Sequence, residues 1–511
     1  MILYLSQKTI PMKKLALLLF AGALSVNFAL AQPKTSGKQL KEFDAWVENA
    51  RKEWGAVGLA VTVIKDNEVI FKKGYGLRQL GTHDAVDTNT LFACASTTKA
   101  MTATCMGMLV DEGKVNWDDR VIQYLPGFQL YDPYVTRELR IRDLFLHNSG
   151  VGNTDFLWGF MDIGSDNILE KMRWVKPSYS FRSGFIYQNI FYLVAGKVIE
   201  KVSGHPWDEF IQERIFGPLG MSNTYPSLQA APTANRTKPH MRVDGKLMVI
   251  EDMSADAIGP AGSVWSSIDD MGKWALCMLD SGKYTGGRLV SPKTWEEMTK
   301  AQTLVPSSEF YPTAQLTKPN FTTYGMGWFQ HDYKGRKVNF HTGSLPGSIA
   351  IHGQLPEEKI AVYVFGNTDH VEVRHAIMYK AFDLFALGGA TDWGSGFLAL
   401  YTKLDKAAEA ARKKQDEKRV MGTKPSLPLS GYTGVYQDKL YGTVEVTATG
   451  SQLSANINDM HKATLDHWNY DTFKGPLGKK WDGEVTALFQ LNSEGKVTTL
   501  DLSGFVLQKV K

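Results

Sequence analysis

This 511-residue sequence lacks several features that would assign it to a narrow class of protein. It has only three cysteines, Cys94, Cys105 and Cys277, whereas an exported protein held together by disulfides would have more. Its formal net charge of +4 gives no basis for nucleic-acid binding. The eleven histidines are scattered, so they indicate no zinc site, and no glycine-rich phosphate loop stands out. We therefore expect no metal, no cofactor and no nucleic-acid partner.

Long apolar runs are absent too, apart from one near the N-terminus. Two lysines precede the apolar run 15–30, which ends in the small-x-small cleavage pattern Ala29-Leu30-Ala31. Because the run is short and an asparagine interrupts it, it is more typical of a signal peptide than of a membrane span. We predict a signal peptide over residues 1–31, cleaved near Ala31-Gln32, and a periplasmic or secreted mature protein without a membrane span.

The pattern of the main part of the chain predicts strands at both ends and helices between them. The predicted strands are 57–65, 68–75, 324–332, 337–341, 349–355 and 360–365, and the clearest helices are 38–51, 141–146, 188–202 and 267–279, the last with Ser266 as N-cap. Strands that enclose a helical region should meet in one sheet, with the helices packed against it. We therefore predict a mixed α/β (α+β) fold: an antiparallel sheet flanked by helices, with an inserted helical lobe.

A change of composition marks a second domain near the C-terminus. Residues 396–428 are rich in charge and are interpreted as a helical linker, which ends at Pro425-Ser426-Leu427-Pro428. Beyond it, short β-rich runs recur at 442–447, 452–457, 485–491 and 497–502. We predict a main domain over residues 32–395 and a small antiparallel barrel over residues 429–511.

Ser96-Thr97-Thr98-Lys99 is the most informative motif in this sequence, because it precedes a long apolar helical segment. The exposed backbone N–H groups and the dipole at a helix N-terminus favour negative charge there. Lys99 lies one turn on and can reach the Ser96 hydroxyl, which is a poor nucleophile unless a base takes its proton. The same pattern recurs at Ser493-Glu494-Gly495-Lys496, where a hairpin turn is predicted, so the pattern alone is a weak signal.

Two further motifs supply groups that such a nucleophile needs. In Tyr187-Gln188-Asn189, the phenol can accept or relay a proton, and the amide of Asn189 can orient Lys99 and bind a substrate carbonyl. In His341-Thr342-Gly343, the histidine can supply a further donor, and the glycine lets a substrate approach the strand closely. The backbone N–H groups of Ser96 and Ser344 could form an oxyanion hole.

Each of these motifs also has an ordinary structural explanation. Tyr187 lies in an aromatic run that is typical of a core, and His341-Thr342-Gly343 could simply end a strand. Cys94 is a rival nucleophile, although no histidine partner is evident for it. No Gly-x-Ser-x-Gly motif is present, which argues against an α/β-hydrolase.

Taken together and in this order, the motifs resemble those of the serine β-lactamase and penicillin-binding-protein family. The resemblance is to its class C-like branch, which includes D,D-peptidases, D-aminopeptidases and esterases, and whose motifs are Ser-x-x-Lys, Tyr-x-Asn and Lys-Thr-Gly or His-x-Gly. Supporting matches are Leu146-His147-Asn148-Ser149-Gly150, Pro260-Ala261-Gly262-Ser263 and Tyr324-Gly325-Met326-Gly327-Trp328. The resemblance covers roughly residues 38–390, and the C-terminal part is similar to a lipocalin-like accessory domain.

The resemblance implies a role for each motif residue. Ser96 would be acylated, Lys99 and Tyr187 would act as acid and base, and Ser96 and Ser344 would hold the oxyanion. The implied substrate-binding residues are Asn189, His341, Thr342 and Gly343. His341 replaces the lysine that is usual in β-lactamases of this class, and a neutral histidine would bind a substrate carboxylate less well.

We therefore predict an exported serine hydrolase that cleaves a peptide, amide or ester bond of a small-molecule or peptide substrate. A β-lactamase and a non-catalytic penicillin-binding or sensor protein are the alternatives. The scissile bond, the oligomeric state and the role of the barrel, which could cover the cleft or mediate self-association, are left open.

Overall fold

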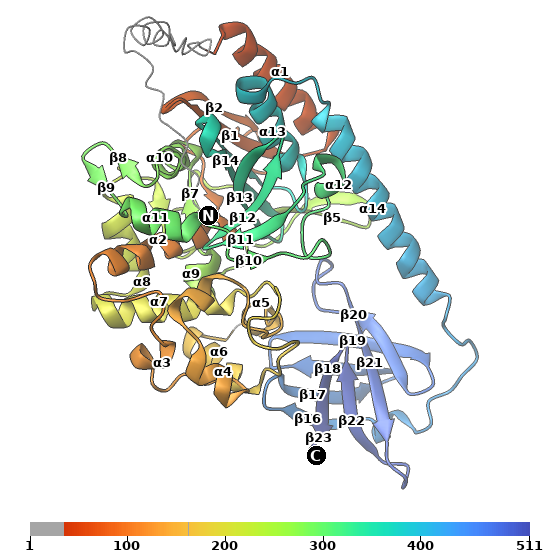
Figure 1. Cartoon of the computed structure of the whole chain (residues 1–511). Helices are drawn as coiled ribbons and strands as arrows, with labels where there is room; N and C mark the ends of the chain where they lie inside the picture. Colours follow the sequence, from red (N-terminus) through yellow and green to blue (C-terminus); the bar gives the residue numbers. More distant parts are fainter. Residues whose placement is uncertain (1–34, 162) are drawn as a thin grey trace, which may run out of the picture.

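The computed structural model describes residues 35–161 and 163–511, and the predicted signal peptide lies outside them. Figure 1 shows a larger part and a smaller C-terminal barrel, joined by the long helix α14 (Trp393–Asp416). Across the described residues, no helix combines the length and apolar character needed to cross a membrane.

The larger part is built on one antiparallel sheet of eight strands, in the order β10-β11-β12-β13-β14-β15-β1-β2. Its strands are β1 (Gly58–Lys65), β2 (Glu68–Gly76), β10 (Thr303–Leu304), β11 (Thr322–Gly325), β12 (Trp328–Tyr333), β13 (Arg336–Leu345), β14 (Ser348–Leu355) and β15 (Ile360–Gly366). β1 pairs with β15, with Val61 opposite Val364. The prediction that the first and last strands meet is therefore confirmed.

Helices cover both faces of this sheet, because successive side chains of a strand point to opposite sides. Val362 and Val364 of β15 belong to a core that includes α1 (Gly37–Glu53) and α13 (Val373–Phe382). Tyr363 and Phe365 belong to a second core, which contains most of the inserted helical lobe. Figure 1 shows α1, α13 and α14 on one side of the sheet and the lobe on the other.

The inserted lobe lies between β2 and β10 in sequence and contains most of the helices. They are α2 (Thr98–Asp111), α3 (Val121–Tyr124), α4 (Pro133–Glu138), α5 (Phe156–Gly159), α6 (Ser165–Lys171), α7 (Ile190–Ser203), α8 (Trp207–Ile211), α9 (Gly259–Gly262), α10 (Ile268–Leu279) and α11 (Pro292–Thr299), and α12 (Ala314–Thr317) follows β10. The short strands of the same region are β3 (Phe92–Ala93), β4 (Thr224–Tyr225), β5 (His240–Val243), β6 (Lys246–Val249), β7 (Trp265–Ser266), β8 (Lys283–Tyr284) and β9 (Gly287–Arg288).

Four predicted elements differ in the structure. The helical linker predicted over 396–428 is helical only as far as Asp416, where α14 ends. The strand predicted at 324–332 is two strands, because Gly327 (φ 82°) turns the chain against α2, where a Cβ would lie 2.8 Å from the Cα of Ala100. The helix predicted at 141–146 is a 3₁₀ helix, Ile141–Phe145. The N-cap of α10 is Ser267 rather than Ser266, since its side chain accepts the backbone N–H of Asp270.

The C-terminal part is a closed antiparallel barrel of eight strands, which confirms the predicted barrel. Its strands are β16 (Gly434–Asp438), β17 (Gly442–Thr449), β18 (Gln452–Ile457), β19 (His461–Asn469), β20 (Thr472–Pro476), β21 (Glu484–Leu491), β22 (Val497–Leu502) and β23 (Phe505–Lys509). Large side chains such as Tyr436, Phe473 and Phe489 fill the interior. The second Ser-x-x-Lys lies in the turn between β21 and β22, which confirms the predicted hairpin turn.

Candidate active site

Ser96 and Lys99 lie where the sheet meets the helical lobe. Ser96 is half-buried in the 3₁₀ helix Ala95–Thr97 that leads into α2, and Lys99 is fully buried in the first turn of α2. The Lys99 Nζ lies 3.0 Å from the Ser96 Oγ. It also donates to the Asn189 Oδ1 (2.6 Å) and to the backbone carbonyl of Ala261 (2.8 Å). The structure therefore brings the first and second motifs into direct contact.

Burial lowers the pKa of Lys99 to about 7, although the negative charge of Asp155 acts in the opposite direction. Near neutral pH, Lys99 is therefore neutral in a substantial fraction of the protein molecules. A neutral amine has two N–H groups, and Asn189 and Ala261 each offer only an acceptor oxygen to them. The lone pair is then left for the Ser96 hydroxyl. This arrangement prepares Lys99 to accept the proton of Ser96.

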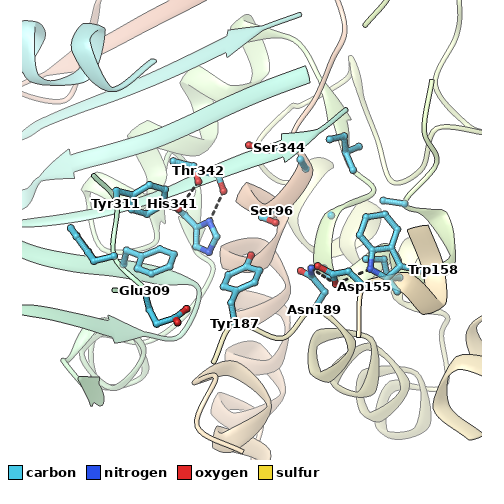
Figure 2. A pocket seen from close by; sticks show the side chains of 18 of the residues that line it. Ser96, Asp155, Trp158, Tyr187, Asn189, Glu309, Tyr311, His341, Thr342 and Ser344 are labelled. Atoms are coloured by element: carbon cyan, nitrogen blue, oxygen red, sulfur yellow. Dashed lines mark hydrogen bonds between the residues drawn. The ribbon is translucent and has the colours of Figure 1, made fainter. Parts of the chain in front are cut away.

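Tyr187 faces the same hydroxyl from the other side of the pocket (Figure 2). Burial raises its pKa well above the ordinary value, and a side-chain hydrogen bond with Ser96 offsets this only in part. Its ring lies 5.0 Å from the Lys99 Nζ. Because the phenol stays protonated near neutral pH, the structure favours a proton relay by Tyr187 over a phenolate base.

Asn189 is held at both ends of its amide by protein groups. Its Oδ1 accepts from Lys99, and its Nδ2 donates to the Asp155 Oδ1 at 2.8 Å. The indole N–H of Trp158 donates to the same carboxylate oxygen at 2.9 Å. Asn189 therefore contacts Lys99 as predicted, and because its Nδ2 has a second N–H and the residue lines the pocket, the contact with a substrate carbonyl stays a prediction.

Asp155 and Trp158 belong to no motif that the sequence reasoning used. Both come from the short helix α5 and the residue before it, 34 and 31 positions ahead of Asn189 along the chain. A carboxylate and an indole at these positions carry no local signal, because only the folded lobe brings them to the site. They were missed for that reason.

The third motif lies on β13 and forms the opposite wall. The His341 Nδ1 donates to the Thr342 carbonyl at 2.6 Å, so its Nε2 accepts from the Tyr324 hydroxyl at 2.9 Å. Burial and the nearby Lys99 lower the pKa of His341 to about 3, so the ring is neutral. The expected free donor is therefore absent from this ring, since the protein already occupies both nitrogens.

Gly343 has a packing role that the sequence analysis did not predict. A Cβ at this position would lie 2.2 Å from the carbonyl oxygen of Cys94, so the glycine lets β13 pack against the loop that carries the nucleophile. The strand is held from behind by Arg374, whose Nη1 donates to the Gly343 carbonyl (2.6 Å) and to the Ser344 Oγ (2.9 Å). Arg374 is itself fixed by two hydrogen bonds to Glu372.

The three motifs surround a pocket of about 400 Å³, shown in Figure 2. Motif residues that line it are Ser96, Tyr187, Asn189, His341, Thr342 and Ser344, whereas Lys99 and Gly343 lie directly behind its wall. Ser96 and Ser344, the two residues of the predicted oxyanion hole, therefore both line the pocket. Its other walls are largely aromatic and include Trp158, Phe185, Phe310, Tyr311 and Phe329.

The charged side chains that line this pocket are both acidic. They are Asp155 and Glu309, and the described lining residues include no lysine or arginine. Cys94 does not line it, and burial raises the pKa of its thiol to about 12. The rival hypothesis of a Cys94 nucleophile is therefore not supported.

Comparisons with known proteins agree with this geometry. Residues 43–384 match the family described as Beta-lactamase, and residues 418–510 match a domain of unknown function, DUF3471. The chain is 28% identical over 440 residues to the unguisins hydrolase ungD of Aspergillus violaceofuscus, covering 79% of this chain and 76% of that protein. It is 25% identical over 339 residues to penicillin-binding protein 4 of Amycolatopsis lactamdurans, covering 64% and 84%.

Solved structures show the same fold. The octameric penicillin-binding protein homologue from Pyrococcus abyssi superimposes with a TM-score of 0.60 at 21% identity, over 92% of this chain and 99% of that one. The D-amino acid amidase from Ochrobactrum anthropi SV3 gives a TM-score of 0.56 at 20% identity, over 73% and 100%. Because the family match spans more than half of the sequence and includes all three motifs, this chain belongs to the β-lactamase family.

Proposed function

We propose that this protein is a serine hydrolase that cleaves a peptide, amide or ester bond through an acyl-enzyme on Ser96. The observation that carries the proposal is the set of contacts around Lys99. Its two neutral N–H groups are directed to Asn189 and Ala261, which leaves its lone pair 3.0 Å from the Ser96 Oγ. These contacts support the proposal, because an activated serine hydroxyl needs a neighbouring base.

In the acylation step, neutral Lys99 takes the hydroxyl proton as the Ser96 Oγ forms a bond to the substrate carbonyl carbon. The carbonyl electrons move to the oxygen, which the backbone N–H groups of Ser96 and Ser344 would stabilise. As the intermediate collapses, the bond to the leaving group breaks. Tyr187 gives that group its proton and regains one from the Lys99 ammonium.

In the deacylation step, a water molecule replaces the leaving group. Lys99, neutral again, removes a proton from the water, directly or through Tyr187, as the water oxygen attacks the acyl carbon. The ester bond to Ser96 breaks, and the Oγ regains its proton from Lys99. The enzyme returns to its starting state and releases a carboxylic acid.

The pocket supports a peptidase, amidase or esterase more than a β-lactamase. His341 is neutral and bonded within the protein, and the two charged lining residues are acidic, so a substrate carboxylate would find no cation there. Relatives' names include a hydrolase and a putative D-alanyl-D-alanine carboxypeptidase of Salmonella gallinarum, which supports hydrolysis of a peptide or amide bond. We expect apolar or aromatic acyl groups to fit the aromatic walls.

A substrate panel tests this proposal. It should contain nitrophenyl esters, D- and L-amino-acid amides and the cephalosporin nitrocefin, each with the wild-type protein and with Ser96→Ala. We expect turnover of an ester or amide that Ser96→Ala abolishes, and much slower hydrolysis of nitrocefin. Turnover that Ser96→Ala leaves unchanged would contradict the proposal. No turnover by either protein would favour a non-catalytic binding or sensor protein, and rapid nitrocefin hydrolysis would favour a β-lactamase.

We also propose that the protein is exported, because residues 1–31 have the pattern of a signal peptide. N-terminal sequencing of the protein from its native host should then begin near Gln32. A mature protein that retains residues 1–31 would contradict export by this route.

A further inference from the structure

One short segment of the helical lobe lies between the candidate active site and the barrel. It runs from Asp155 through α5 to Phe160, and its side chains alternate between two sides. Asp155 and Trp158 line the active-site pocket. Phe156 and Phe160 instead contact the barrel. The segment therefore touches both functional parts of the molecule with different residues.

The barrel contacts Phe160 through ring stacking and a hydrogen bond. The Phe160 ring stacks on the imidazole of His461, with centroids 4.1 Å apart and planes 6° apart. The His461 Nε2 donates to the Phe160 backbone carbonyl at 2.7 Å. Phe160 also packs against the core of the barrel.

Phe156 completes this contact at the same end of the barrel. Its ring lies 5.3 Å from that of Tyr441 and 5.2 Å from that of Phe505. The space that remains between these side chains and the barrel interior is only about 10 Å³. Side chains of the catalytic part thus fill most of the space between α5 and the barrel interior.

On its other side, the segment is connected to the nucleophile by hydrogen bonds, shown in part in Figure 2. The Asp155 Oδ1 accepts from both Trp158 and Asn189. Asn189 in turn accepts from Lys99, which lies 3.0 Å from the Ser96 Oγ. Two residues, Asn189 and Lys99, therefore connect the barrel-bound segment to the reacting hydroxyl.

The segment has little structure of its own to hold it in place. α5 is a helix of four residues without a side-chain cap at its N-terminus. A single helical turn is not stable by itself in water, so its position depends on tertiary contacts. The contacts with His461, Tyr441 and Phe505 supply part of them, and the burial of Leu157 in the main core of the lobe supplies the rest.

We propose that the C-terminal barrel is a positioning domain for the catalytic lysine, acting through Phe160 and His461. By fixing α5, it would hold Asp155 and Trp158 against Asn189, and so hold the amide oxygen that orients Lys99. This inference rests on the proposed function, because it assigns Lys99 a role in acylating Ser96. It gives the barrel a task other than carrying a ligand or covering the cleft.

The experiment compares Phe160→Ala and His461→Ala with His467→Ala in the full-length protein. His467 is a matched control, because its Nε2 also contacts a backbone carbonyl, that of Tyr470 at 2.9 Å. It lies at the other end of β19, next to the turn that leads to β20, where its ring contacts that of Phe473 in the barrel. Each variant is tested for its melting temperature, its rate of labelling by a fluorophosphonate, and its kcat and KM on a nitrophenyl ester.

We expect Phe160→Ala and His461→Ala to slow the labelling of Ser96 about tenfold, because small displacements of catalytic groups are costly. kcat should fall by a similar factor, and KM should rise for an ester that contacts Trp158. His461→Gln should recover most of the rate, since its amide N–H can again donate to the Phe160 carbonyl. His467→Ala should behave like the wild-type protein.

These variants should remain folded and docked, because the barrel has a separate attachment. The Lys171 Nζ donates to the backbone carbonyls of Lys439 and Leu440, at 2.8 and 3.0 Å. A change in melting temperature alone would therefore not explain slow labelling.

The pH dependence of labelling separates positioning from a loss of stability. The titratable groups around Lys99 are Asp155, Tyr187, Tyr192, His147 and His341. Of these, only Asp155 belongs to the segment that the barrel holds, and its charge raises the pKa of Lys99. If Asp155 retreats in Phe160→Ala, the acid limb of the labelling rate should move to lower pH.

The outcomes distinguish this inference from the proposed function. If the wild-type protein is labelled at Ser96 but Phe160→Ala and His461→Ala match it in rate and pH profile, the positioning role is wrong and the proposed function stands. A slow rate with an unmoved acid limb in both variants would also contradict it. If the wild-type protein is not labelled at Ser96, both proposals fail together.

Discussion

The chemistry of this site depends on the protonation of one residue, Lys99. Its ammonium form has no lone pair for the Ser96 proton, whereas its neutral form has one directed at the hydroxyl. Burial makes the neutral form accessible by lowering the pKa to about 7. The reactivity of Ser96 should therefore depend strongly on pH, and the first predictions at the scale of single residues concern this dependence.

The first prediction concerns the pH profile of the wild-type protein. kcat/KM should rise about tenfold per pH unit below pH 7 and level off above it, because the reactive form of Lys99 is the one that has lost its proton. Stopped-flow hydrolysis of a neutral ester between pH 4 and pH 9 measures this. An acid limb near pH 4, as for a carboxylate base, would contradict it.

Lys99→Arg gives the second prediction. A guanidinium stays protonated across the accessible pH range, so it can keep the positive charge but cannot act as a base. We expect kcat to fall about 10³-fold, the range typical of a lost general base. Single-turnover acylation measures this, and a variant that retains a tenth of the activity would rule out Lys99 as the base.

Asp155→Asn gives the third prediction. The substitution keeps an oxygen that can accept from Trp158 and Asn189 but removes the negative charge that raises the pKa of Lys99. The acid limb of the pH profile should therefore move to lower pH. The labelling rate of Ser96, measured as a function of pH, gives the size of this shift. A limb that moves to higher pH would show that Asp155 acts on Lys99 in another way.

The sequence was a good guide to some residues of the site and a poor guide to others. Ser96 and Lys99 could be paired because helical spacing fixes their separation within one turn. Asp155 and Arg374 could not be found, since each acts through contacts with residues about 30 or more positions away, and Trp158 acts through Asp155. Local patterns carry no information about such contacts.

At the scale of elements, close packing between β13 and the nucleophile loop sets the geometry of the site. Gly343 allows this approach, because any side chain would collide with the Cys94 carbonyl. The same holds for Gly327, which brings the turn between β11 and β12 against α2. These two contacts place α2, and hence Ser96, against the sheet.

Gly343→Ala should therefore destabilise the protein by about 1–3 kcal/mol and slow the labelling of Ser96, because an added methyl group must displace the nucleophile loop. Chemical denaturation measures the stability change. Gly127→Ala is the control, since no atom lies within 4 Å of a Cβ built there. Equal stability and equal labelling of the two variants would contradict this account of the packing.

The helices and strands of the structure agree closely with the predicted residue ranges where the prediction rested on hydrophobic periodicity. The helix predicted at 38–51 is α1, and the strand predicted at 452–457 is β18. The strand predicted at 324–332 was wrong because Gly327 ends it through a contact with α2, which lies more than 200 residues earlier. Tertiary contacts of this kind override local preference.

At the scale of the whole molecule, the pocket is built by segments that come from the sheet, the lobe and the loop before α12. Asp155 and Glu309, its charged lining residues, come from the lobe and from this loop. The sequence predicted both domains, but it could not show that the barrel reaches the active site, because Phe160 and His461 lie about 300 residues apart.

The acidic lining gives a prediction about substrates. An ester with a free carboxylate beside its acyl group should react at least about tenfold more slowly than the matching methyl ester, because like charges repel across a pocket of low dielectric. The difference should shrink as salt is added. A preference for the carboxylate would contradict the pocket electrostatics described above.

Peptide mapping of a fluorophosphonate adduct tests the central claim most directly. The account holds that Ser96, Lys99 and Tyr187 form one reactive group, so mass spectrometry should place the adduct on Ser96, with labelling that rises through about pH 7. An adduct on another residue, or no adduct on a folded protein at pH 8, would contradict it.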